Sequence, residues 1–275
     1  MLSNLSVFAK IKGIGSASGL YLRQNSLFVI GDNSAYLYEY NLENKSLNKI
    51  EILKGLKTLE NIPKADKPDF EVLCNHANSL YILGSGSTDR RDLMIEYQLD
   101  TKKVIQHSLT SLYAKVKAAC KIDDENLNIE GAIFTGDTWF LFNRGNGNAN
   151  KNGVIKINGS DLTKAQEIEF TPIMLLKTDQ KLVSFTDAIL HENNIYFIAA
   201  AENTQSTYHD GEILGSYIGS LDAKTLQLNF TKQISAKQKF EGITFYKQIK
   251  NQLQFLVCED RDTDVLETVI YKLVV

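Results

Sequence analysis

The chain of 275 residues carries a formal net charge of −3, and 43% of its residues are hydrophobic and 23% charged. This composition is typical of a soluble globular protein, and a chain of this length can bury a large core without disulfide or metal staples. The sequence has no basic stripe and no run of 18 apolar residues, so neither a nucleic-acid partner nor a membrane partner is expected.

The cysteine count and the N-terminus bear on the cellular compartment. Cys74, Cys120 and Cys258 are odd in number and show no metal-binding spacing, which favours buried free thiols in a reducing compartment. The N-terminus lacks a charged segment followed by a long apolar one, the pattern of a secretory signal. These features predict a cytoplasmic protein.

The chain begins with a predicted strand over residues 5–11 and then repeats one pattern five times. Each repeat opens on a short phrase with a polar residue at its second position. The five phrases are Ala17–Leu20, Phe70–Leu73, Ile129–Ile133, Thr186–Ile189 and Phe240–Ile243. Their polar residues are 53, 59, 57 and 54 positions apart, and a near-constant period of this size indicates a repeat architecture.

The same elements follow each phrase in the same order. A polar turn leads to a compact apolar run such as residues 80–83, which predicts a strand buried on both faces. A polar loop then leads to a more alternating run such as residues 93–97, which predicts a strand with one solvated face. A turn rich in Asn and Asp precedes a fourth strand such as residues 104–109.

Four antiparallel strands in each of five repeats predict an all-β protein, a five-bladed β-propeller formed by one domain over residues 1–275. The fifth repeat ends at its third strand, residues 268–273, and the strand at residues 5–11 is the expected donor of the fourth. The last blade is therefore closed by the N-terminal strand, which fastens the ring.

Two connections between repeats are longer than a turn requires. The first covers residues 54–68, and the second covers residues 111–128. Leu112, Val116 and Ala119 in the second connection have helical spacing, which predicts one short amphipathic helix with Ser111 as its cap.

Four of the five phrases carry a carboxylate at the matching position, and the first carries Ser18. The acids are Glu71, Glu130, Asp187 and Glu241. The first strand of a propeller blade lines the central channel, and the loop from the second to the third strand returns to the same face. We therefore expect the four acids and these five loops to meet at one mouth of the channel.

The mouth-side loops supply further candidates for a ligand site. These are Asp32, Asn33, Arg90, Arg91, Arg144, Glu202, Glu259 and Arg261. One of the four histidines, His209, also falls in such a loop and is a candidate general base, with a solvated surface position as the alternative.

Four carboxylates near one axis repel one another, so they require a cation or protons. One hypothesis is a bound Ca²⁺ or Mg²⁺, because hard cations take carboxylate and amide oxygens, with Asn33 or Asn203 as additional ligands. The other is a girdle of ion pairs in which arginines of the same loops neutralise the acids and seal the blades. The two can hold at different carboxylates.

With Glu130-Gly131-Ala132 and Glu241-Gly242-Ile243 opening two inner strands, and Asp69-Phe70-Glu71 opening another, the chain resembles the phytase-like (esterase-like) propellers. More broadly it is similar to calcium-dependent propellers of the gluconolactonase and paraoxonase type. The phrase Phe142–Gly147 resembles an uncharacterised bacterial five-bladed branch.

This resemblance implies a metal site in the central channel that is held by acidic residues of the inner strands. The sequence departs from the pattern in three ways: the lactonase type generally has six blades, its ligands include Asn residues on the inner strands, and true phytases carry histidine-rich clusters. The resemblance therefore implies a site at the channel mouth and does not identify a substrate.

Together these features favour a divalent-cation-dependent hydrolase of a small ester, lactone or phosphorylated substrate. The ion would polarise the reacting oxygen, and Arg144 with Arg90 or Arg91 would orient an anionic group. The alternative is a non-enzymatic propeller that binds a small-molecule, anionic or protein partner and uses its acidic ring as an ion-pair girdle. An enzyme predicts a narrow, deep pocket, whereas a binding platform predicts a wide, exposed patch.

Overall fold

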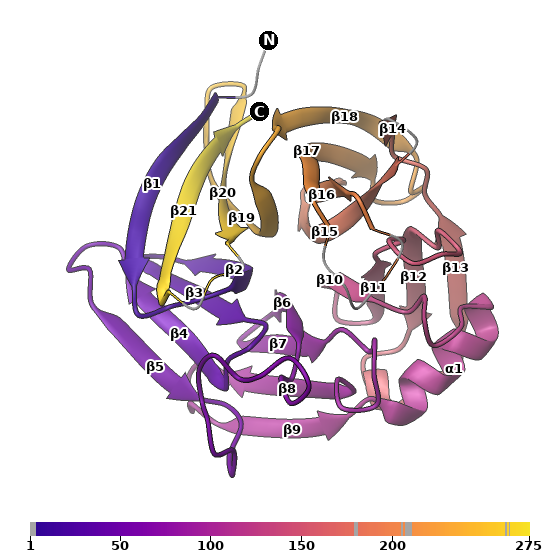
Figure 1. Ribbon diagram of the computed structural model, residues 1–275, viewed down its shortest axis with the longest axis horizontal. Helices are drawn as coiled ribbons and strands as arrows, with labels where there is room; N and C mark the ends of the chain where they lie inside the picture. Colours follow the sequence, from indigo (N-terminus) through magenta and orange to yellow (C-terminus); the bar gives the residue numbers. More distant parts are fainter. Residues whose placement is uncertain (1–3, 179–180, 205, 207–210, 262, 264) are drawn as a thin grey trace.

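Five small antiparallel sheets stand around a common axis, as predicted for a five-bladed β-propeller (Figure 1). The computed structural model describes residues 4–178, 181–204, 206, 211–261, 263 and 265–275. The first strand of each blade lies innermost, and the five innermost strands contact one another around the ring. Compact apolar runs bounded by polar turns thus form buried strands, as their β-branched and aromatic content favours.

Blades one to three each contain four strands in sequence order. The first blade comprises β2 (Ala17–Arg23), β3 (Ser26–Gly31), β4 (Tyr36–Asn41) and β5 (Leu47–Glu51). The second comprises β6 (Phe70–His76), β7 (Ser79–Gly84), β8 (Leu93–Gln98) and β9 (Val104–Ser108). The third comprises β10 (Ile129–Phe134), β11 (Thr138–Asn143), β12 (Gly153–Asn158) and β13 (Ile168–Pro172).

The fourth blade departs from the expected four strands. It comprises β15 (Lys181–His191), β16 (Asn194–Glu202), β17 (Ile213–Asp222) and β18 (Leu228–Ser235). A fifth, two-residue strand, β14 (Lys177–Thr178), pairs with the start of β15. β15 has 11 residues and extends beyond the phrase that the sequence identifies, which leaves its first residues free to pair with β14.

The two ends of the chain close the ring in the fifth blade. This blade comprises β19 (Lys239–Ile249), β20 (Gln252–Asp260), β21 (Glu267–Val274) and, as its outermost strand, β1 (Asn4–Lys12). β1 pairs antiparallel with β21 from Asn4 opposite Val274 to Lys12 opposite Glu267. The predicted closure by the N-terminal strand is confirmed.

Apolar side chains fill the five interfaces between neighbouring blades, each as a separate cluster. Trp139 and Val72, for example, lie in one cluster between the second and third blades. A blade buries its faces only against its neighbours, so this packing holds each innermost strand in a fixed position around the axis.

The connection after the second blade contains α1 (Thr110–Cys120), which covers the cluster between the second and third blades. The predicted helix is confirmed, but its predicted cap is wrong. The helix starts one residue before Ser111, and the capping position belongs to Leu109, which offers no side-chain hydrogen bond. The three cysteines are free and buried. Among the residues that the structure describes, no helix is long and apolar enough to cross a membrane.

Candidate functional site

Each innermost strand contains a register shift of the kind made by a β-bulge. The shifts fall between Ala17 and Gly19, Phe70 and Val72, Ile129 and Gly131, Phe185 and Asp187, and Phe240 and Gly242. The residue inside each shift has no partner in the ladder, which re-aims its side chain. These bulged residues are Ser18, Glu71, Glu130, Thr186 and Glu241.

The fourth repeat is therefore displaced by one residue from the predicted alignment. Thr186, and not Asp187, is the counterpart of Glu130. The Thr186 hydroxyl donates to the carbonyl of Phe240 in the next blade at 2.7 Å, and Ser18 in the same way donates to the carbonyl of Phe70 at 2.5 Å. The bulged positions thus provide three carboxylates and two hydroxyls. Each of the two hydroxyls forms a hydrogen bond to the neighbouring blade.

Asp187 is the residue that follows the bulge in β15; it lies opposite Ile198 of β16 and is buried. Its carboxylate accepts the backbone N–H of Ala188 at 2.7 Å and that of Ile243 at 2.8 Å. Burial raises the pKa of Asp187 well above the usual range, although both amides favour the charged form. Among the described residues, Asp187 is not part of the lining of the mouth cavity.

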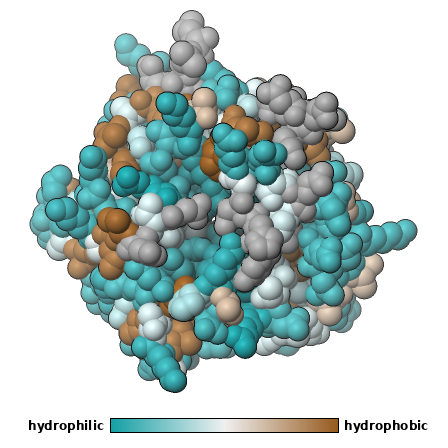
Figure 2. Space-filling model, viewed as in Figure 1, coloured by the Kyte–Doolittle hydropathy of each residue, from teal (hydrophilic) through white to brown (hydrophobic). Residues whose placement is uncertain are grey.

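The channel mouth holds a cavity of about 50 Å³ that is lined only by polar and charged residues. Seen down the axis of the ring, hydrophilic residues surround its centre (Figure 2). The lining residues are Asp32, Lys64, Lys67, Asp69, Glu71, Arg91, Asn128, Glu130, Arg144, Asn146, Lys239, Glu241 and Asp260. Three of the four predicted acids, Glu71, Glu130 and Glu241, line this cavity together with residues from four of the five mouth-side loops.

The first and second blades supply one half of the cavity. Carboxylate oxygens of Asp32, Asp69 and Glu71 lie within 4.8 Å of one another. Lys67 forms ion pairs with Asp32 and, at 2.7 Å, with Asp69, while Arg91 pairs with the other oxygen of Asp69 at 2.7 Å. Among the described residues, no hydrogen bond or ion pair reaches Glu71.

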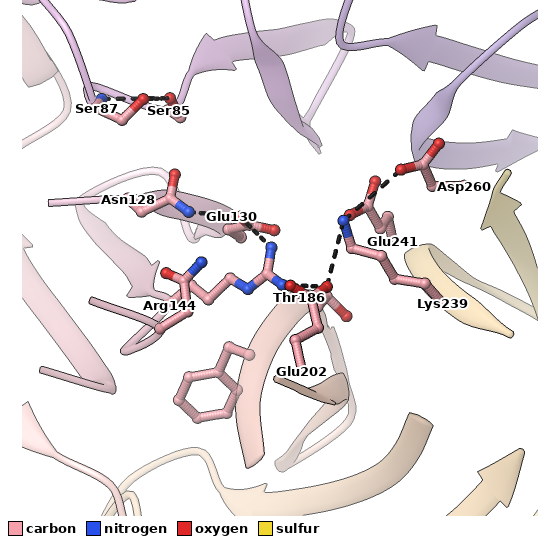
Figure 3. Close-up of polar contacts among 12 residues, drawn as sticks. Ser85, Ser87, Asn128, Glu130, Arg144, Thr186, Glu202, Lys239, Glu241 and Asp260 are labelled. Carbon is pink, nitrogen blue, oxygen red and sulfur yellow. Dashed lines mark hydrogen bonds and ion pairs between the residues drawn. The ribbon is translucent and has the colours of Figure 1, made fainter. Parts of the chain in front are cut away.

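The third to fifth blades supply the other half (Figure 3). Arg144 bridges Glu130 at 3.0 Å and Glu202 at 2.6 Å. Lys239 pairs with Glu241 at 2.6 Å and lies 3.5 Å from Glu202 and 3.7 Å from Asp260. Both cations are buried, so these contacts form a desolvated network and not a solvated surface patch.

One of the two carboxylate oxygens of Glu130 has no partner in this network. Its Oε1 accepts the side-chain amide of Asn128 at 2.7 Å in addition to Arg144, whereas its Oε2 is buried without a hydrogen-bond partner. A buried carboxylate oxygen without a partner is costly, because the group has lost water and gained nothing in exchange.

Burial and neighbouring charges shift the pKa values of the groups in this cluster. Burial raises the pKa of Glu71 well above its usual range, and the charges of Asp69 and Glu130 raise it further. Burial likewise raises the pKa of Glu241, against the opposing effect of Lys239. The cations stay charged, because burial alone would lower the pKa of Lys239 but its acidic neighbours raise it.

Several predicted site residues lie away from the cavity. Arg90 is exposed and pairs with Asp66 at 2.6 Å, and the exposed Arg261 lies 3.7 Å from Glu267. Glu259 accepts the hydroxyl of Tyr271, and Asn33 donates to the hydroxyl of Ser16. None of these four, nor Asn203, lines the cavity among the described residues. His209 lies outside the described residues, so its role as a general base stays a prediction.

Sequence reasoning overlooked Lys64, Lys67, Asp69, Asn128 and Lys239 as site residues. Two signals were present. Asp69, Asn128 and Lys239 each stand two positions before a bulged glutamate, so a polar residue recurs there. Lys64 and Lys67 belong to the long connection over residues 54–68, whose return to the mouth the sequence pattern does not reveal.

This arrangement suits a small ion better than a large substrate. Pockets that enclose drug-sized ligands measure roughly 300–1,000 Å³, whereas the mouth cavity measures about 50 Å³. A water molecule needs roughly 10–15 Å³ of such space, so the cavity has room for an ion and a few waters.

Comparisons with known proteins agree with the fold. No curated protein matches the chain. A solved exo-1,5-alpha-L-arabinanase from a bovine ruminal metagenomic library superposes with a TM-score of 0.53 at 10% identity, over 97% of this chain and 94% of that one. A bifunctional GH43-CE protein of Bacteroides eggerthii superposes with a TM-score of 0.55 at 9% identity, over 95% of this chain and 33% of that one. At such identities the likeness concerns the fold alone.

The family comparison covers nearly the whole chain. Residues 13–275 match a protein family described as a family of unknown function, DUF6929. The matched region contains all five innermost strands and every residue that lines the mouth cavity. The chain therefore belongs to the DUF6929 family.

Proposed function

We propose that the mouth cavity binds one divalent cation, Ca²⁺ or Mg²⁺, beside Glu71, where the carboxylate oxygens of Asp32, Asp69 and Glu71 lie within 4.8 Å of one another, and that Glu130 and Glu241 are direct or water-mediated ligands. The observation that carries this proposal is the buried Oε2 of Glu130, which has no hydrogen-bond partner and belongs to a residue that lines the cavity. Glu71, which no described residue reaches by a hydrogen bond or ion pair, lines the same cavity. Carboxylate oxygens are preferred ligands of both ions.

The charges of the side chains around the cavity favour an ion with two positive charges. The described lining residues together with Glu202 comprise seven carboxyl groups and five cationic side chains. If all of these groups are ionised, the cluster has an excess of two negative charges. One divalent cation neutralises that excess without protonating any glutamate.

The ion pairs orient the glutamates for this role. Arg144 and Asn128 hold Oε1 of Glu130, and Lys239 holds Oε1 of Glu241. Each glutamate thereby keeps its second oxygen for an ion. Groups that orient ligands in this way are a regular part of metal sites in proteins. The arginine girdle and the ion are in this view complementary, because they use different oxygens of the same side chains.

A bound ion would supply Lewis-acid chemistry at the channel mouth and would polarise a carbonyl or phosphoryl oxygen of a small ester, lactone or phosphorylated substrate. The substrate would reach the ion from the open side, since the cavity is too small to enclose it. The resemblance to phytase-like and gluconolactonase-like propellers supports this hydrolytic role. A non-enzymatic binding propeller is the second candidate, favoured by the engagement of Arg91 and Arg144 in ion pairs with acids of the cavity.

Calorimetric titration tests the cation site. Protein treated with EDTA is titrated with Ca²⁺ and with Mg²⁺, and we expect one site per chain and a higher melting temperature for at least one ion. Glu71→Gln and Glu130→Gln should each weaken binding at least about tenfold. Asp66→Asn is the matched control, because Asp66 is exposed and pairs outside the cavity. If wild-type protein shows neither heat nor a shift with either ion, the cluster is an ion-pair girdle only.

A substrate screen separates the two functional candidates. p-Nitrophenyl acetate, p-nitrophenyl phosphate and a δ-lactone are incubated with the ion-loaded protein and with EDTA-treated protein. The hydrolase proposal expects turnover of at least one substrate that requires the ion and is lost in Glu71→Gln. Tight ion binding without turnover of any of the three substrates would favour the binding propeller.

A further inference from the structure

The central channel has a second cavity at its other end. It measures about 320 Å³, and the second halves of all five innermost strands form its wall. None of the fourteen residues that line it carries a charge at neutral pH, and most are leucine, isoleucine, alanine or phenylalanine. The two cavities of one channel therefore have opposite chemistry.

A difference between the repeats opens this space. The second residue after the bulge is Leu20, Leu73, Ala132, Ala188 and Ile243 in blades one to five. The third and fourth blades are neighbours in the ring, so two adjacent innermost strands carry short side chains at the position where the other blades carry long ones. Both alanines line the cavity.

We propose that this apolar channel cavity binds a small, uncharged, largely hydrocarbon molecule, one to each chain. Its volume lies at the lower end of the range for pockets that take small ligands. A charged group buried there would lose its water without gaining a partner, which restricts the ligand to a neutral one.

The polar groups of the cavity define the ligand further. Tyr21 and Cys74 also line the cavity, and the hydroxyl of Thr244 accepts the backbone N–H of Leu22 at 3.1 Å. Asn75 lies in the lining and is exposed, which puts its amide at the open rim. The ligand that fits is a largely hydrocarbon molecule whose neutral polar group, where it has one, is directed at that rim. The site is separate from the cation site and does not depend on it.

The test uses N-phenyl-1-naphthylamine, a neutral apolar fluorophore, and the full-length chain. We expect saturable binding at one probe per chain, with the blue-shifted emission of an apolar environment. The double variant Ala132→Leu/Ala188→Leu carries the residue type that other blades have at these positions, and it should bind at least about tenfold more weakly. Ala118→Leu, on an exposed position of α1, should bind like wild type, as should Glu71→Gln at the mouth.

Far-UV circular dichroism and melting temperature establish that each variant is folded. If the double variant does not fold, Ala132→Val, which fills less of the cavity, is tested and should weaken binding by a smaller factor. Failure of wild-type protein to bind the probe saturably, or equal binding by wild type and a folded cavity-filled variant, would overturn the proposal. A wild-type dimer that the double variant converts to monomer would overturn it too, since the occupant would then be a second copy of the chain.

Discussion

The substitution Arg144→Met tests whether the buried ion pairs hold the mouth together. Arg144 bridges Glu130 and Glu202, and the side chains of all three residues are at most 5% exposed. Methionine fills a similar volume but leaves both carboxylates without their main cation. Breaking one partner out of a buried pair costs about 3–5 kcal/mol. For a chain of this size, that loss corresponds to a fall in melting temperature of about 6–20 °C.

The loss of stability in Arg144→Met should depend on pH, and the pKa of Glu130 determines the direction of that dependence. Burial raises the pKa of Glu130 and Arg144 lowers it, so removal of Arg144 moves the folded-state pKa further above the unfolded value. Between these two pKa values the folded state binds more protons than the unfolded state. Its stability therefore falls as the pH rises through that window. The deficit of Arg144→Met should be larger at pH 8 than at pH 5.

Thermal denaturation of EDTA-treated protein at the two pH values measures both effects. Arg90→Met is the matched control, because Arg90 is 70% exposed and pairs with an exposed carboxylate, Asp66. Its stability should stay within about 0.5 kcal/mol of wild type. The reasoning is refuted if Arg144→Met melts within about 2 °C of wild type at pH 8, or if its deficit is the same at both pH values.

Three further predictions concern the ring and its interior. Thr186→Val removes the hydroxyl that donates to the carbonyl of Phe240, so unfolding experiments should show a loss of about 1–3 kcal/mol, and unchanged stability would contradict the placement of Thr186 at the bulge. A chain that starts at residue 13 lacks β1, and a native-like cooperative melt of that chain would contradict closure by pairing with β21. Burial raises the pKa of Cys120 to about 11, so its thiol should resist labelling by DTNB at pH 8 until the protein is denatured; rapid labelling of native protein would show the burial to be wrong.

The propeller could be predicted from the sequence because each repeat carries its own local signals. Strand-forming runs such as Leu80–Leu83 alternate with turn-forming residues at a nearly constant period, and the fifth repeat lacks a strand that residues 5–11 supply. Side-chain chemistry also indicated the mouth: Glu71, Glu130 and Glu241 were identified as inner-strand acids and line one cavity.

The alignment of the fourth repeat could not be predicted in the same way. The sequence Asp187-Ala188-Ile189 fits the repeated phrase with Asp187 at the acidic position, because an acid followed by a small residue and isoleucine matches Glu241-Gly242-Ile243. Which of two adjacent polar residues occupies a bulge depends on pairing with β16, where Phe185 lies opposite Ala199 and Asp187 opposite Ile198. A shift of one residue reverses the side to which a strand residue points, and so it removes Asp187 from the mouth.

By itself the sequence determined the five blades, the strand that closes the ring and the kind of residue that faces the axis, since these follow from local pattern and period. Only the tertiary structure decided which charges meet. Lys67 and Lys239 approach Asp32 and Glu202 from distant parts of the chain, and their pairing depends on how the loops return to the axis. It also decided that the two ends of one channel differ, because the apolar cavity is formed by residues of all five innermost strands, with Ala132 and Ala188 on neighbouring blades in its lining.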